Sequence, residues 1–313
     1  MTALCSATGV GNPAIYVQTP GTQISIITDG NLNLSSEKAD TFTIGTVATT
    51  GSDNRWLERL TGSLDYYNIK IKGAILTPEP NLIVASCYNY FGTNPNYSAT
   101  NANCASVVRG GGDIFFLSDP GNPATGNYAG INAGVIKTSG LDLQMRWGFD
   151  LEWMGAPSDS GAITFDLYLN RLIDYKQQER ANLPKIDYAG TVSYFGQGLS
   201  EGASLPTWKG TLNTNYAIGD FSFDLRARYI DGMDNRARRQ YIGEPSFTGV
   251  GDVWYWDFGG TWDVTEYASL RVGVNNISDR QPPTYAPNVQ SGTDPALYDV
   301  IGRRVFFQTN VKF

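Results

Sequence analysis

The sequence predicts an all-β fold, namely an antiparallel transmembrane β-barrel of which this chain forms a part, with about nine long strands and long extracellular loops. Three observations support this prediction. Apolar and polar residues alternate over long segments, the connections alternate between short and long, and aromatic residues gather near the ends of the expected strands.

The composition agrees with a chain of strands and turns. Charged residues make up only 17% of the 313 residues, whereas aromatic residues reach 12% and glycines number 35. A net charge of -7 and a pI near 4.7 argue against nucleic acid as a partner. No apolar run is long enough for a membrane-spanning helix, but a transmembrane strand needs only about 9 to 11 residues with every second one apolar.

The absence of histidine excludes several chemistries at once. Without imidazole there are no His-based catalytic triads, no general acid–base catalysis by histidine and few ways to build a zinc site. We expect no metal ion and no cofactor.

The longest regular alternation covers residues 141–153. Its apolar members run from Leu141 to Trp153, and they alternate without a slip with polar residues and glycine. The pattern returns at residues 208–218 and 221–229, on both sides of Gly219-Asp220, which predicts a hairpin that places Ile218 opposite Phe221. Further strands are expected at residues 41–50, 64–75, 163–175, 254–264, 270–277 and 305–313.

The connections and the faces of these strands fit a barrel better than a soluble β-sandwich. Short connections at residues 154–162, 219–220 and 265–269 alternate with long ones at 87–104, 181–205, 231–251 and 278–304, as in bacterial outer-membrane barrels. The strands are also longer than those of most sandwiches. The residues expected to face lipid include Leu143, Trp147, Phe149, Phe223, Leu225, Val272 and Phe307.

The cysteines and the start of the chain leave some alternatives open. Cys87 and Cys104 lie in a polar stretch between strands, where we expect a disulfide that closes a surface loop in an oxidising compartment. Cys5 would be left over, either as a free thiol or with a partner upstream. The residues after Met1 lack the features of a secretory signal, so the protein is either cytoplasmic or a fragment whose beginning is missing.

Five segments, in order along the chain, resemble landmarks of a known family. They are NLNLSSEKAD at residues 31–40, DYYNI at 65–69, residues 132–143 with NAG and GLDL, VNNISDRQPP at 274–283, and the ending IGRRVFF to Phe313. The first has Ser-Ser where the family usually has Lys-Pro. Together they are similar to the C-terminal part of the β-barrel of TonB-dependent receptors, and the resemblance covers nearly the whole of residues 1–313.

The resemblance implies a transporter, and not an enzyme, in the bacterial cell outer membrane. Members of this family import scarce nutrients, such as ferric siderophores, cobalamin or oligosaccharides, through a barrel of roughly 22 strands that holds an N-terminal plug. Implied partners are the small-molecule nutrient, outer-membrane lipid, TonB acting through the plug, and the barrel-assembly machinery, which would read the final strand and Phe313. The plug and the signal peptide are absent from these 313 residues.

Two groups of residues are candidate sites. The inward carboxylates Asp142, Asp150, Glu152 and Asp166 could form a glycosidase pair, but their alternating positions favour a hydrated inner wall. The loop residues Arg236, Arg238, Arg239 and Tyr241 could bind an anionic ligand, such as a siderophore complex or a lipopolysaccharide phosphate, although a solvated loop is the simpler interpretation. A secreted carbohydrate-binding or adhesive β-domain is the alternative function.

Overall fold

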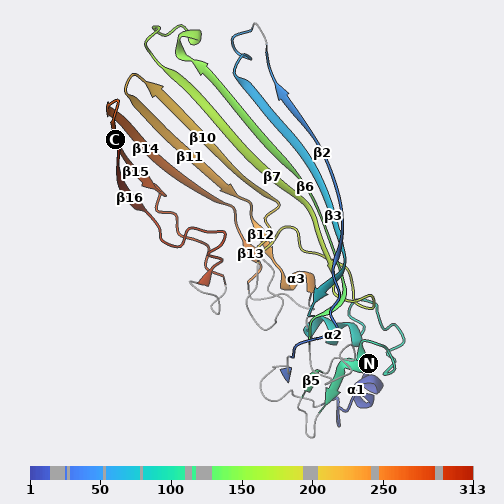
Figure 1. Cartoon of the computed structure of the whole chain (residues 1–313). Helices are drawn as coiled ribbons and strands as arrows, with labels where there is room; N and C mark the ends of the chain where they lie inside the picture. The colour runs from blue at the N-terminus through green and yellow to red at the C-terminus, as the bar shows by residue number, and fades with distance from the viewer. Residues whose placement is uncertain are drawn as a thin grey trace.

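The alternating segments form one large antiparallel sheet. A computed structural model describes residues 1–14, 25–26, 29–51, 54–77, 80–109, 115–117, 129–192, 204–240, 247–285 and 292–312. Nine strands pair in sequence order, and the short strand β8 (Ile186–Asp187) pairs with β7, one of the nine (Figure 1). The nine are β2 (Lys38–Thr49), β3 (Leu60–Leu76), β6 (Ile131–Asp150), β7 (Ala162–Gln178), β10 (Trp208–Ile218), β11 (Phe221–Ile230), β14 (Val253–Thr265), β15 (Ala268–Asn275) and β16 (Arg304–Val311).

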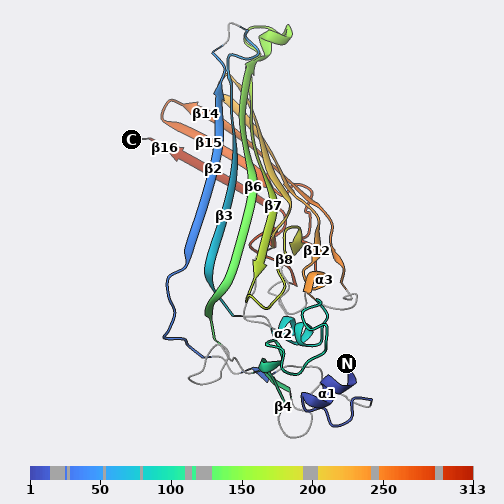
Figure 2. The same cartoon turned by 90° about the vertical axis from the view of Figure 1, so that its right-hand side faces the viewer.

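The predicted fold class is confirmed. The sheet curves like the wall of a barrel but does not close, and β2 and β16 form its two edges (Figures 1 and 2). The expected number of about nine long strands agrees with the series from β2 to β16.

The predicted hairpin between β10 and β11 is also confirmed. Ile218 lies opposite Phe221, and the pairing continues without a slip to Lys209 and Ile230. Gly219 between the strands has a φ of 51°, which a residue without a Cβ adopts at little cost. A two-residue turn therefore fixes the register of the whole hairpin.

One predicted strand end is wrong. The strand expected at residues 141–153 is β6, which begins earlier, at Ile131, and ends at Asp150. The next four residues form a 3-10 helix, η2 (Leu151–Met154), which Gly155 terminates with a φ of 91°. Trp153 fits the apolar alternation of the strand but lies in η2. Its ring packs there against Trp56 in the neighbouring turn, with 5.9 Å between the ring centroids.

The register gives the sheet one apolar and one polar face. On the apolar face, Trp147 of β6 contacts Phe165 of β7, with ring centroids 5.9 Å apart, and Phe223 of β11 contacts Phe258 of β14 at 6.4 Å. Much of this face is open, since Val272 is 53% exposed. The paired rows place all seven residues predicted to face lipid on this one face, namely Leu143, Trp147, Phe149, Phe223, Leu225, Val272 and Phe307.

The smaller elements belong to the N-terminal segment and to the connections between the long strands at one end of the sheet. They are α1 (Thr2–Ala7), β1 (Ser25–Ile26), α2 (Pro80–Cys87), η1 (Cys104–Ser106), β4 (Val107–Arg109), β5 (Phe115–Leu117), β9 (Thr191–Val192), β12 (Met233–Asn235), α3 (Ala237–Gln240) and β13 (Gly249–Val250). In the part of the chain that the structure describes, no helix is both long and apolar enough to cross a membrane.

The two faces predict different costs for a buried charge. Leu225 lies near the middle of the apolar face, so Leu225→Arg should lower the free energy of unfolding by about 2 to 4 kcal/mol. Thr211→Arg on the polar face should change it by less than about 1 kcal/mol. The measurement is denaturant unfolding, from lipid vesicles, of the complete barrel that contains this chain. Equal losses for the two variants would contradict the assignment of faces.

Candidate functional site

The long connections gather at one end of the sheet, which we call the loop end. The N-terminal segment and the connections β3–β6, β7–β10, β11–β14 and β15–β16 lie there, while short turns close the opposite end (Figure 1). Buried side chains in these connections form two separate clusters. The loop end is therefore a packed structure, which can hold side chains in fixed positions.

The first cluster, the disulfide lobe, joins three segments that are distant in sequence. A hydroxyl hydrogen bond of 2.8 Å links Thr8, just after α1, to Tyr88, just after α2. Asn103 and Asn182 exchange hydrogen bonds of 3.1 and 2.7 Å between the β3–β6 and β7–β10 connections. The buried core of the lobe comprises Leu4, Leu82, Ile83, Cys87, Cys104, Val107, Leu183, Ile186 and Tyr188.

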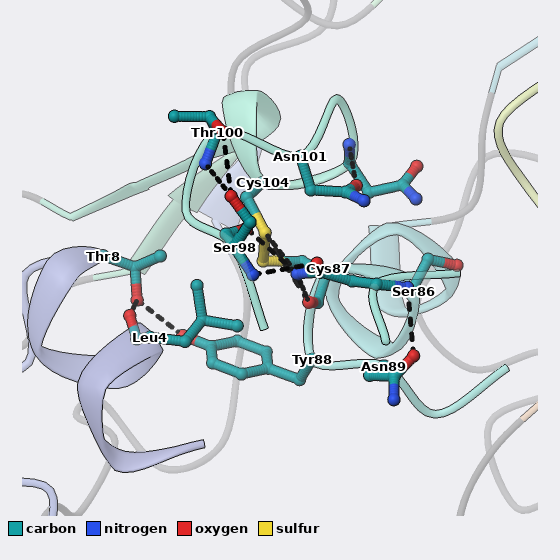
Figure 3. The surroundings of a disulfide bond; sticks show 12 residues. Leu4, Thr8, Ser86, Cys87, Tyr88, Asn89, Ser98, Thr100, Asn101 and Cys104 are labelled. Atoms are coloured by element: carbon teal, nitrogen blue, oxygen red, sulfur yellow. Dashed lines mark hydrogen bonds between the residues drawn. A yellow bond between two sulfur atoms is a disulfide. The ribbon is translucent and has the colours of Figure 1, made fainter. Parts of the chain in front are cut away.

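A disulfide between Cys87 and Cys104 lies at the centre of this lobe (Figure 3). It connects the end of α2 to the start of η1, with the two Cα atoms 4.8 Å apart. The amide of Asn94 supports the loop between them, because it donates to the carbonyl oxygens of Cys87 and Ser98 at 2.7 and 3.0 Å. Cys5 is a free cysteine.

The second cluster, the tyrosine lobe, lies over β11 and β14. Burial raises the pKa of Tyr298 above that of an ordinary phenol, so this hydroxyl stays neutral at physiological pH. The β15–β16 connection also packs on the sheet through a charged group, since Asp299 pairs with Arg228 of β11 at 3.9 Å. The buried core comprises Val192, Ile230, Met233, Val253, Tyr255, Tyr285 and Tyr298.

The structure divides the predicted arginine cluster into two parts. Arg236 is buried, with its guanidinium 4.8 Å from the centre of the Tyr188 ring and a hydrogen bond of 3.4 Å to Thr191. Burial lowers its pKa below that of a free arginine, since desolvation disfavours the charged form. Arg236 is therefore placed to hold the loop together, because it packs against the ring of Tyr188.

Arg238 and Arg239 are more accessible. Both lie in α3 and form ion pairs with Asp234, at 3.6 and 3.5 Å. They line an open hollow of about 410 Å³ together with residues of β12 and β13. An anion that enters this hollow could replace or share the carboxylate of Asp234. Tyr241, the fourth predicted residue, lies outside the described residues.

The polar face forms the inner wall of the partial barrel. Arginines there pair with carboxylates or an amide on other strands, so the wall carries fixed charges of both signs around a hollow of about 460 Å³. The alternation predicted a polar face, but only the register reveals the partners. The pairs are Arg146–Asp166 at 3.4 Å, Arg226–Asn213 at 2.9 Å, Arg228–Asp257 at 3.2 Å and Arg271–Asp224 at 3.1 Å.

The candidate carboxylates do not form a glycosidase pair. Asp142 and Asp150 are eight residues apart on one strand, or about 26 Å, and Asp166 lies opposite Arg146, halfway between them. These spacings exceed the roughly 5 to 9.5 Å that glycoside hydrolysis requires. Asp142 accepts a hydrogen bond from Asn170, and Asp150 pairs with Arg59. Glu152 was wrongly assigned to the inner wall, because it lies in η2.

Comparison with known proteins identifies the family. A family model described as TonB dependent receptor-like, beta-barrel, matches residues 7–277. The chain belongs to the TonB-dependent receptor family. Members of this family are transporters whose barrels lie in the outer membrane, and the resemblance inferred from five sequence segments is thereby confirmed. A comparison with curated protein sequences found no match.

Solved structures of TonB-dependent receptors share the fold. A ferric enterobactin receptor from Pseudomonas aeruginosa in complex with enterobactin has a TM-score of 0.51 and 15% sequence identity, over 91% of this chain and 33% of that one. The FrpB iron transporter from Neisseria meningitidis has a TM-score of 0.50 and 15% identity, over 92% and 33% of the two chains. This chain thus spans about a third of either receptor.

The disulfide should stabilise the disulfide lobe more than the rest of the barrel. In Cys87→Ser/Cys104→Ser, amide hydrogens in residues 80–107 should exchange faster, by an amount equivalent to about 3 kcal/mol of local stability for a loop of this length. Hydrogen exchange read by mass spectrometry measures the change. Cys5→Ser is the matched control and should leave this exchange unchanged. Unaltered exchange in the double variant would refute the stabilising role.

Proposed function

We propose that this chain is the C-terminal portion, residues 1–313, of the barrel of an outer-membrane receptor that imports a scarce nutrient with the help of TonB. The observation that carries the proposal is the match of residues 7–277 to the barrel of TonB-dependent receptors. The substrate class would be a ferric siderophore, cobalamin or an oligosaccharide.

The apolar face supports a place in the outer membrane. Exposed aromatic and aliphatic side chains cover one side of the sheet from β3 to β16, including Leu64, Leu225, Phe258 and Phe307. A secreted carbohydrate-binding or adhesive domain would turn such a face into its core, since soluble proteins rarely expose large apolar patches. Lipid is the environment that such a face requires.

The loop end supports a role in substrate binding. Arg238 and Arg239 line a hollow at this end, where a ligand could arrive from outside the cell, and their guanidinium groups suit carboxylate, catecholate or phosphate oxygens. The names of two similar structures, a ferric enterobactin receptor and an iron transporter, favour an iron complex among the candidates. We therefore place the first contact with substrate in this hollow.

The inner wall supports coupling to TonB through a plug. Its fixed charges of both signs offer sites where a plug domain could dock and be released without the exposure of apolar surface. In this scheme no bond of the substrate is broken. The energy for release would come from TonB and not from the barrel.

The proposal predicts TonB-dependent uptake that involves the two accessible arginines. A complete receptor that carries this chain should take up one radiolabelled nutrient class in a tonB-positive strain and none in a tonB-negative strain. Arg238→Gln/Arg239→Gln should raise the half-saturating nutrient concentration about tenfold, because charge-assisted hydrogen bonds are lost.

The matched control removes two arginines from another loop. Arg280→Gln/Arg303→Gln lies in the β15–β16 connection and should change the half-saturating concentration less than about twofold. If no nutrient class shows uptake that depends on TonB, the proposed function is contradicted. Equal effects of the two double variants would contradict only the role of Arg238 and Arg239.

The last strand supports a further partner, the barrel-assembly machinery. Phe313 itself lies outside the described residues, but β16 is an edge strand whose outward residues Val305, Phe307 and Val311 are exposed. An exposed edge can add to another sheet. Deletion of Phe313 from the complete receptor should slow assembly and leave precursor in the periplasm, as measured by pulse–chase labelling. If only the heat stability of the finished barrel falls, Phe313 is a packing residue and not a signal.

A further inference from the structure

A further hollow lies in the inner wall, where β10 and β11 reach the loop end. It has a volume of about 470 Å³ and is lined by residues of β3, β6, β7, β10 and β11. Leu297 of the β15–β16 connection also lines it. A hollow of this size can hold a small molecule. We call it the β10 hollow.

One row of facing residues runs along the β10 hollow. Asp65 of β3 lies opposite Asp142 of β6, Asp142 lies opposite Asn170 of β7, and Asn170 lies opposite Lys209 of β10. Asp142 precedes the outward Leu143, so the row points to the inner wall. The row therefore leads from two carboxylates, past an amide, to an ammonium group.

The charges of this row differ from the others of the inner wall. Arg146, Arg228 and Arg271 each have a carboxylate within 3.4 Å. Within the described part of the chain, by contrast, Asp65, Asp142 and Lys209 form no ion pair, and Asp142 accepts a hydrogen bond of 2.7 Å from Asn170. These three charges are therefore available to a ligand.

The two carboxylates turn away from each other. Asp142 turns toward β7, where Asn170 donates to it. Asp65 turns toward β2, where its carboxylate lies over Gly45 and leaves no room for a Cβ. Like charges that lie directly opposite each other on neighbouring strands repel. A cation at this end would remove the repulsion, so the acidic end of the hollow favours an ammonium group.

Lys209 marks the opposite end of the row. It lies two strands away from Asp142, which corresponds to about 10 Å at the usual strand spacing. Arg228 also lines the hollow, but its charge is shared with Asp257 and Asp299. Lys209 is therefore the group at this end that can pair with a carboxylate of a ligand.

The lining between the two ends suits peptide groups. Gln144, Asn170 and Thr211 carry amide and hydroxyl groups, which both donate and accept hydrogen bonds. Tyr168, which is 48% exposed, and Leu297 add apolar surface. The order of carboxylate, amide and ammonium groups along the hollow is thus complementary to a short peptide with a charged N-terminus and a charged C-terminus.

We propose that the β10 hollow binds a short zwitterionic peptide, with its ammonium group at Asp65 and Asp142 and its carboxylate at Lys209. An extended chain covers about 3.3 to 3.6 Å per residue, so about three residues span the distance between the ends. Since the row carries two carboxylates and one ammonium group, it disfavours an anion, unlike the hollow beside Arg238 and Arg239. The inference rests on the proposed role of this chain in a transport barrel and adds a ligand class to it.

The test is equilibrium dialysis of radiolabelled triglycine against the complete receptor in detergent, at neutral pH and low salt. Triglycine should bind about tenfold more tightly than N-acetyltriglycine, which lacks the ammonium group, and than triglycinamide, which lacks the carboxylate. Glycine has its two charges too close together to reach both ends, and maltotriose is neutral, so neither should compete with triglycine.

Two variants test the two ends separately. Asp65→Asn/Asp142→Asn should bind triglycine about tenfold more weakly and should no longer prefer it to N-acetyltriglycine. Lys209→Gln should weaken binding to a similar extent and should no longer prefer triglycine to triglycinamide. A merely structural role of these residues would weaken the binding of all three peptides alike. The control Asp220→Asn/Asp263→Asn removes two carboxylates near the short turns and should bind triglycine as the unmodified receptor does.

Several results would overturn the inference. They are no binding of triglycine to the complete receptor, equal competition by N-acetyltriglycine, triglycinamide or maltotriose, and an equal loss of binding in the control. The shift in electrophoretic mobility on heating reports the folded barrel in each variant. TonB-dependent uptake of a nutrient without triglycine binding refutes only the β10 hollow, whereas triglycine binding without any TonB-dependent uptake refutes only the proposed transport.

Discussion

The whole structure depends on the pairing of backbone hydrogen bonds between neighbouring strands. In hydrocarbon no water can satisfy a free N–H or C=O group, so each spanning strand must pair along its full length. The nine long strands meet this demand through continuous antiparallel pairing from β2 to β16. Among the described strands, β2 and β16 are the edges of the sheet, and a complete barrel of this family would cover them with further strands.

Continuous pairing also determines which side chains meet. Since side chains alternate along a strand, one register fixes an apolar face, a polar face and every cross-strand neighbour. Arg271 reaches Asp224 across β14, and Asp40 and Asp187 stand at the two ends of a row that contains Lys70, Lys137 and Lys176 for the same reason. The register therefore creates the favourable pairs of the inner wall.

The sequence was most informative where local rules decide the structure. Alternation located the strands and faces, and Gly219-Asp220 located a hairpin, because both signals act over neighbouring residues. The sequence did not reveal the end of β6. The apolar alternation runs on to Trp153, although residues 151–154 already form the 3-10 helix η2, which ends at Gly155. The loop end was the least predictable part, because its lobes join segments such as Thr8 and Tyr88 that only tertiary packing brings together.

The division of the arginine cluster shows how such packing produces a candidate binding site. In sequence, Arg236, Arg238 and Arg239 are equivalent, yet the first is buried over the ring of Tyr188 and the others line a hollow. A buried guanidinium is costly unless its surroundings compensate, so its position is sharply defined. Because Arg236 immediately precedes α3, its fixed position also orients α3. The two accessible arginines therefore reach the hollow already ordered, which reduces the entropy that a ligand would otherwise lose on binding.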